Sequence, residues 1–110
     1  MMQKNIIDAN SVLSKLDKMD VNSYFLNFMS NKSFEVGIIR LSPNQTDTQG
    51  THSVDELYFV IEGEGYINIQ EKDHPIKKGS CIFVRSNSKH HFHGNKEQLV
   101  VLYVFNVSNR

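Results

Sequence analysis

The chain of 110 residues contains one cysteine, no tryptophan and only two prolines, and neither sign of charge is in excess. A single thiol cannot form an internal disulfide, which is typical of a reducing compartment, so we expect a cytoplasmic protein. Twelve Lys and Arg residues balance twelve Asp and Glu residues. The basic clusters that bind nucleic acid or anionic lipid are missing. We therefore do not expect nucleic acid as a partner. No stretch approaches the roughly 20 apolar residues of a membrane span, so we do not expect a membrane as a partner either.

What the sequence does contain is enough apolar material for one core, since 39% of the residues are apolar and seven are Phe. A chain of this length is about one domain long. Residues 6–20 place apolar side chains at steps of three and four, which predicts a short amphipathic helix that Asn10 or Ser11 interrupts or caps. Residues 24–29 are compatible with either helix or strand. We therefore expect an N-terminal helical extension over residues 1–30, packed on a domain formed by residues 31–110.

After residue 33 the apolar pattern changes to that of short strands separated by turns. The expected turns are Glu62–Gly65 and Lys72–Pro75. The expected strands cover residues 34–41, 57–61, 66–70 and 99–105, and residues 76–84 contain one more strand, broken by Lys78-Gly79-Ser80. Many short strands without interleaved helices predict an all-β sandwich or barrel with antiparallel strands.

Two of these strands, residues 57–61 and 99–105, are apolar on both faces, which predicts that both faces are covered. One face turns into the core. The other needs the N-terminal helix, a second sheet or a partner subunit, and we expect a homodimer. Cys81, within the apolar run of residues 81–84, is expected to be a small buried side chain.

Two histidines and a glutamate form the candidate site. His52 lies four residues before Glu56, at the start of an apolar strand, and His90 follows a later strand. Two imidazoles and one carboxylate are the ligands of His₂Glu zinc sites and of the two-histidine, one-carboxylate Fe(II) sites. Spacing alone is a weak signal, because surface histidines near the ends of strands give the same pattern.

The spacing of these residues resembles the two motifs of the cupin superfamily. His52, Glu56 and Gly63 stand where the first motif has its second histidine, its glutamate and its closing glycine. Gly79 and His90 match the first and last members of the second motif at the right separation. The segment between Gly63 and Gly79 has the length usual in compact microbial cupins, and the likeness covers most of the chain.

Two positions depart from the cupin pattern. Gly50 replaces the first histidine of the first motif, so three protein ligands remain unless Gln49, Thr51 or Asp55 supplies a fourth donor. In the second motif, Arg85-Ser86-Asn87 replaces the usual Pro-x-Gly turn. Asn tolerates a left-handed backbone better than other residues with a side chain, so Asn87 is predicted to keep the turn.

Strand periodicity predicts which side chains accompany the candidate ligands. Tyr58 shares a face with Glu56, where its phenol is either a catalytic acid, base or orienting group, or a tyrosine of the pocket wall. His91 and His93 are predicted to point away from His90. Arg40 and Arg85 are either ligands for a substrate carboxylate or ordinary surface residues.

The cupin resemblance implies an all-β fold, an antiparallel β-barrel of the double-stranded β-helix or jelly-roll type with a short N-terminal helix. It implies a divalent metal ion (Fe, Mn, Ni or Zn) held by His52, Glu56 and His90, in an enzyme that acts on a small organic molecule. Oxygenase, isomerase and lyase chemistry all remain open, because fold does not fix function. The alternative is a non-catalytic cupin module that binds a small ligand.

Overall fold

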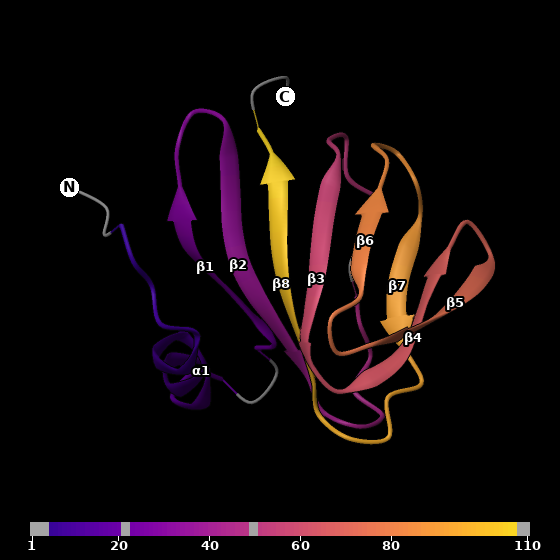
Figure 1. Ribbon diagram of the computed structural model, residues 1–110, viewed down its shortest axis with the longest axis horizontal. Coiled ribbons are helices and arrows are strands. Elements are labelled where there is room, and N and C mark those ends of the chain that lie inside the picture. The colour runs from indigo at the N-terminus through magenta and orange to yellow at the C-terminus, as the bar shows by residue number, and fades with distance from the viewer. Residues whose placement is uncertain (1–4, 21–22, 49–50, 108–110) are drawn as a thin grey trace.

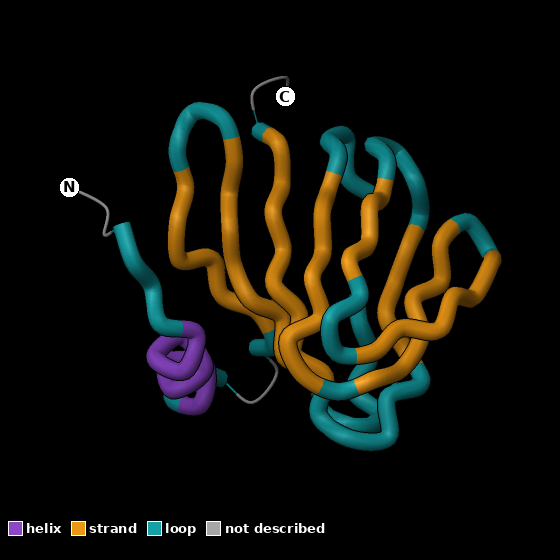
Figure 2. Tube along the Cα trace, in the orientation of Figure 1, coloured by secondary structure: helices purple, strands orange, loops and turns teal. Residues whose placement is uncertain are grey.

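The computed structural model describes residues 5–20, 23–48 and 51–107, and these contain one helix and eight strands. In chain order the elements are α1 (Ala9–Asp17), β1 (Phe25–Ser30), β2 (Phe34–Leu41), β3 (Glu56–Glu62), β4 (Glu64–Ile69), β5 (Lys72–Lys77), β6 (Cys81–Val84), β7 (His90–His93) and β8 (Leu99–Asn106). Strands dominate the trace (Figure 2), as expected from the short apolar runs separated by turns.

The strands form two antiparallel sheets. One has the order β1-β2-β8-β3-β6 and the other the order β5-β4-β7 (Figure 1). Their inner faces share one core, in which Ile67 and Phe92 of the smaller sheet belong to the same buried cluster as Ile39 and Val101 of the larger one. The predicted all-β antiparallel fold with a short N-terminal helix is confirmed, in the form of a jelly-roll sandwich.

The helix packs on the outer face of the larger sheet, next to β1 and β2 (Figure 2). Val12 and Leu16 are buried there against Ile38 and Val100. The helix begins after Asp8, whose side chain accepts a hydrogen bond from the backbone N–H of Asn10 at 3.1 Å. The N-cap is therefore Asp8 rather than Asn10 or Ser11. Within the described ranges, no helix is both long and apolar enough to cross a membrane.

Three local predictions are corrected or decided by the structure. Residues 25–30, whose type was open, form strand β1 and pair with β2. The predicted turn at Lys72–Pro75 is wrong, because β5 occupies it and the chain turns at Gln70 and Glu71, where φ is +49° and +70°. The prediction of a buried Cys81 is also wrong, since β6 alternates and turns Cys81 outward.

The pairing register orders the inner face of the larger sheet into rows. One row consists of Glu56 on β3, Phe105 on β8 and Glu35 on β2. The next row consists of Tyr58, Tyr103 and Gly37 on the same three strands. Residues far apart in the sequence therefore lie side by side next to the candidate ligands.

Candidate metal centre

His52, Glu56 and His90 converge between the two sheets. His52 lies in the loop before β3, Glu56 begins β3 and His90 begins β7. One ligand atom from each lies within 4.8 Å of the others. Glu56 Oε1 is 3.6 Å from His52 Nε2 and 3.4 Å from His90 Nε2. Ligands around one ion at about 2.1 Å lie roughly 3.0–3.4 Å apart in octahedral or tetrahedral geometry, so small side-chain movements suffice to bind a divalent ion.

The donor atoms also have the right chemistry for a cation. His52 Nε2 is buried and has no hydrogen-bond partner among the described residues. His90 Nδ1–H donates to the Ser88 carbonyl oxygen at 2.8 Å, which fixes the tautomer of the neutral ring. The lone pair of His90 Nε2 then faces Glu56. A buried, unbonded nitrogen and an oriented second nitrogen beside a carboxylate fit a metal ion.

Competing effects set the protonation of His90 in the metal-free protein. Burial lowers the pKa of His90, but the Glu56 carboxylate and the Ser88 carbonyl oxygen raise it, with a further contribution from the charge of Asp47. The net pKa of His90 lies above its ordinary value of 6.5. Without a metal, Glu56 and His90 therefore share a proton at pH values below this raised pKa.

Tyr58 lies directly beside these ligands. Its hydroxyl donates a hydrogen bond to Glu56 Oε2 and is 2.9 Å from His90 Nε2. The Tyr58 side chain is fully buried, and its ring meets Phe92 edge to face with centroids 5.0 Å apart. The predicted shared face of Glu56 and Tyr58 is confirmed by their common burial on β3.

The loop before β7 supports His52 through its backbone. Asn87 has φ of +65°, so the predicted left-handed turn is confirmed, and its N–H donates to the His52 carbonyl oxygen at 2.6 Å. Asp55 Oδ1 accepts a hydrogen bond from the Ser86 N–H at 2.9 Å. Asp55 thus fastens this loop to the start of β3.

Of the other residues considered from the sequence, those that the structure describes lie outside the ligand cluster. Thr51 is exposed, and Gln49 and Gly50 lie outside the described residues. Arg40 pairs with Asp17 on the helix at 2.6 Å, on the side of β2 away from the cavity. Arg85 is exposed in its loop.

The outward orientation predicted for two histidines of β7 is confirmed. His90 and Phe92 are buried, whereas His91 and His93 are partly exposed on the opposite face. His93 Nε2 lies 2.9 Å from Asp73 Oδ1, and hydrogen bonds from Asn68 and His93 lower the pKa of Asp73.

Sequence reasoning missed Asp47, a buried carboxylate in the loop after β2. Its Oδ2 accepts a hydrogen bond from the Phe92 N–H at 2.7 Å, and its Oδ1 accepts one from the Tyr24 hydroxyl at 3.2 Å. Asp47 therefore holds β7, and with it His90, against the segment that enters β1. Nothing in the local sequence marks it, because its partners lie 23 and 45 residues away.

We expect Asp47→Asn to lower the free energy of unfolding by about 1–2 kcal/mol, because a charged acceptor becomes a neutral one in a buried network. Urea unfolding of the metal-free protein measures this. Asp73→Asn is the matched control, since Asp73 is exposed and its substitution should change the stability much less. Equal effects of the two changes would contradict the anchoring role of Asp47.

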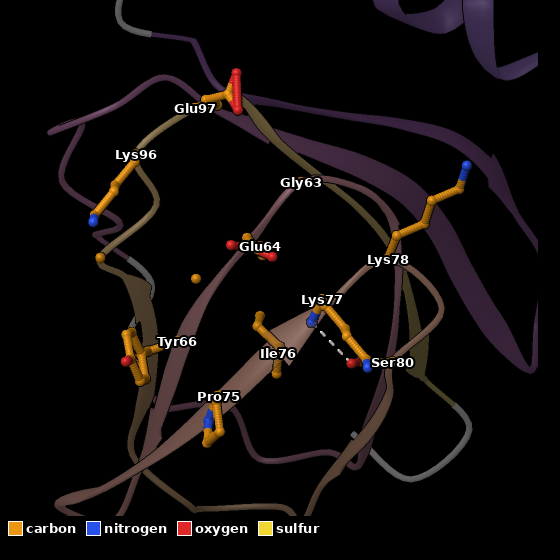
Figure 3. A pocket seen from close by; sticks show the side chains of 12 residues that line it. Gly63, Glu64, Tyr66, Pro75, Ile76, Lys77, Lys78, Ser80, Lys96 and Glu97 are labelled. Atoms are coloured by element: carbon orange, nitrogen blue, oxygen red, sulfur yellow. Dashed lines mark hydrogen bonds between the residues drawn. The ribbon is translucent and has the colours of Figure 1, made fainter.

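A cavity of about 350 Å³ opens beside the centre and has His52 in its wall. A larger, open hollow of about 1020 Å³ lies at the other end of β4 and β5 (Figure 3). Its charged lining consists of Lys77, Lys78, Lys96, Glu64 and Glu97. Lys78 and Lys96 point away from each other in Figure 3, so they do not form a common anion site. The smaller cavity is the candidate substrate site.

Two facing antiparallel sheets with a histidine–glutamate cluster between them define a class, a small jelly-roll domain with a candidate metal centre. A model of the cupin domain family matches residues 37–105. An uncharacterised protein of Streptomyces coelicolor is 35% identical over 81 residues, which is 74% of this chain and 77% of that protein. The chain belongs to the cupin family, as its motifs predicted.

Solved structures agree with this fold. A Thermotoga maritima protein proposed to be an oxalate decarboxylase has a TM-score of 0.66 and 25% identity, with 74% of this chain and 77% of that chain covered. The TT1209 protein of Thermus thermophilus has a TM-score of 0.76 and 18% identity, with 94% of this chain and 97% of that chain covered. The second likeness extends the shared fold over nearly the whole chain.

Proposed function

We propose that this cupin is a metal-dependent enzyme that binds one divalent ion through His52, Glu56 and His90 and acts on a small organic molecule. The observation that carries the proposal is the convergence of three ligand atoms within 4.8 Å, one of them a buried nitrogen without a hydrogen-bond partner among the described residues. When bound, Fe, Mn, Ni or Zn supplies Lewis acidity toward a substrate oxygen, and Fe additionally supplies oxygen chemistry. Oxygenase, isomerase and lyase reactions all fit this centre.

The surrounding side chains have separate tasks in this proposal. Ser88 holds His90 in one tautomer, and Asp55 and Asn87 hold the loop against His52. Tyr58 is the candidate catalytic group, because its hydroxyl lies at the ligand cluster and can hold or pass a proton beside Glu56. The buried core around Tyr58 keeps water away from this proton.

Elemental analysis of the purified protein tests the proposal. The expected result is about one Fe, Mn, Ni or Zn ion per chain, followed by turnover in oxygen-uptake screens with small thiols, diketones and catechols or in isomerase and lyase assays. Protein that contains no metal and binds none in titrations would overturn the proposed centre. Metal binding without turnover would favour the alternative, a non-catalytic module that binds a small ligand.

The pH dependence of metal affinity follows from His90. A metal displaces the proton of His90, so affinity should fall by up to about tenfold per pH unit below the pKa of His90. Because that pKa is raised above 6.5, the fall begins at a higher pH than for an ordinary histidine. Zinc competition titrations between about pH 5.5 and 8.5 measure it, with His93→Gln as a control that should keep the profile.

The stability of the metal-free protein should depend on pH in the opposite direction from its metal affinity. Protonated His90 pairs with Glu56, so its contribution to stability is fully present below pH 6.5 and is lost as the pH rises through the raised pKa. Thermal unfolding of chelator-treated protein measures this trend. A His90→Gln variant that keeps the full wild-type pH dependence would contradict the assignment to His90.

We further propose that the protein is a homodimer formed through the outer face of β3 and β6. Leu57, Phe59 and Phe83 are 43%, 43% and 57% exposed, and exposed Cys81 completes this uncharged group, the β3–β6 patch. The pairs Leu57–Phe83 and Phe59–Cys81 are cross-strand neighbours, so the patch is continuous. An uncharged patch can meet its own copy about a two-fold axis without like-charge repulsion.

Phe83→Asp should therefore convert the dimer into a monomer, because each interface would gain two buried carboxylates without partners. Sedimentation velocity at micromolar concentration measures the change. Tyr66→Asp, which alters an exposed aromatic residue of the other sheet, should remain a dimer. Wild-type protein that sediments as a monomer would overturn the proposed interface.

A further inference from the structure

The cavity beside the candidate metal centre has an unusual distribution of charge. Most of its wall is aromatic or apolar, and its polar side chains besides His52 are Asn27, Glu35 and Thr48 together with two tyrosine hydroxyls. The full lining is Tyr24, Phe25, Asn27, Glu35, Ile39, Thr48, His52, Tyr103 and Phe105. Among these described residues there is one carboxylate and no Lys or Arg.

The strand register places that carboxylate at a defined distance from the centre. Glu56, Phe105 and Glu35 occupy one row across β3, β8 and β2. Neighbouring strands lie about 4.8 Å apart, so the backbone of Glu35 is roughly 10 Å from that of Glu56. The Phe105 ring between them lies 5.1 Å from the His52 ring and is stacked on the Tyr103 ring at 4.7 Å. A flat molecule that reaches from the centre to Glu35 would lie across this aromatic surface.

The end of the cavity at Glu35 is negative. Asn27 Nδ2 donates to Glu35 Oε2 at 3.3 Å, and the Tyr103 hydroxyl donates to Asn27 Oδ1. Burial raises the pKa of Tyr103 well above its ordinary value of 10.0, and the charge of Glu35 raises it further, so the phenol stays neutral. Arg40, the cation of β2, lies toward the other end of that strand, is turned to the helix and pairs there with Asp17.

We propose that this cavity takes a planar, largely apolar molecule with an oxygen-containing metal-binding group at one end and a cationic amino group at the other, received by Glu35. The inference rests on the metal-dependent function proposed above and narrows its substrate class. A phosphate or a second carboxylate at the far end would be repelled by the carboxylate of Glu35, with no Lys or Arg in the described wall to compensate. An amino group would instead gain a charge-assisted hydrogen bond over an aromatic surface.

Three hydroxamates that differ only in the group opposite the metal-binding end test this proposal. They are benzohydroxamic acids with a para-aminomethyl, a para-methyl or a para-carboxyl group. Zinc affinity of the full chain is measured first, and the three probes are then titrated calorimetrically into zinc-loaded protein. The expected order is cationic, then neutral, then anionic, with about tenfold or more between the first and the last.

Glu35→Gln should reduce the preference for the cationic probe over the anionic one by about tenfold. Glu97→Gln, which removes the same charge at the edge of the remote hollow, should keep the wild-type order. Equal or tighter binding of the anionic probe, no binding of any probe to zinc-loaded protein, or an unchanged order in Glu35→Gln would overturn this inference. These failures leave the metal centre standing, whereas a chain that binds no zinc in the first titration overturns the proposed function itself.

Discussion

His90→Ala protein is expected to bind zinc more than about 100-fold more weakly than the wild type. Removing groups that merely orient a metal ligand typically costs about 10–100-fold in affinity, so removing a ligand should cost more. The His90 side chain is buried and its ring is held by Ser88, so no neighbouring imidazole can take its place without rebuilding β7. Competition with a coloured chelator measures the affinity, and elemental analysis measures the metal retained.

Two further variants distinguish the loss of a metal ligand from a loss of the fold. His52→Ala removes a half-exposed ligand, so it should lose metal to a similar extent while disturbing the core less. His93→Ala removes a histidine from the outer face of the same strand as His90 and should leave the affinity within about twofold. Wild-type metal content in both folded His52→Ala and folded His90→Ala would refute the centre.

Gly37→Ala is expected to destabilise the protein by about 3 kcal/mol, because its methyl group has no room. That methyl would overlap the hydroxyl end of Tyr103 and lie 2.5 Å from the Leu26 carbonyl oxygen. Tyr103 is buried, and the carbonyl belongs to the paired strand β1, so neither can retreat freely. Urea unfolding of the metal-free protein measures the loss, and the displaced Tyr103 should also weaken binding in the adjacent cavity.

Gly65→Ala is the matched control, since it adds the same methyl group in β4. There the closest atom is the His93 carbonyl oxygen at 3.1 Å, which requires a shift of only a few tenths of an ångström. We expect a loss of about 1 kcal/mol or less. If Gly37→Ala lowered the free energy of unfolding no more than Gly65→Ala, this would contradict the close packing of Tyr103 against Gly37 of β2.

Several features of the fold and the site were determined by the sequence itself. The period of two in a strand places Glu56 and Tyr58 on one face, whatever lies opposite. The tolerance of Asn for a left-handed backbone keeps the turn at Asn87, and alternation turns His91 and His93 away from His90. These rules act within a few residues of the chain. For that reason they can be applied without knowing the fold.

Other features were decided only by the tertiary structure. The row of Glu56, Phe105 and Glu35 exists because β3, β8 and β2 pair in one register, and a shift of one residue would turn each of these side chains to the other face. Asp47 accepts a hydrogen bond from the Phe92 N–H, which lies 45 residues away in the sequence. Register and long-range hydrogen bonds are set by the packing of the whole core, so the candidate ligands could be named from the sequence, but the charge and shape of the cavity beside them could not.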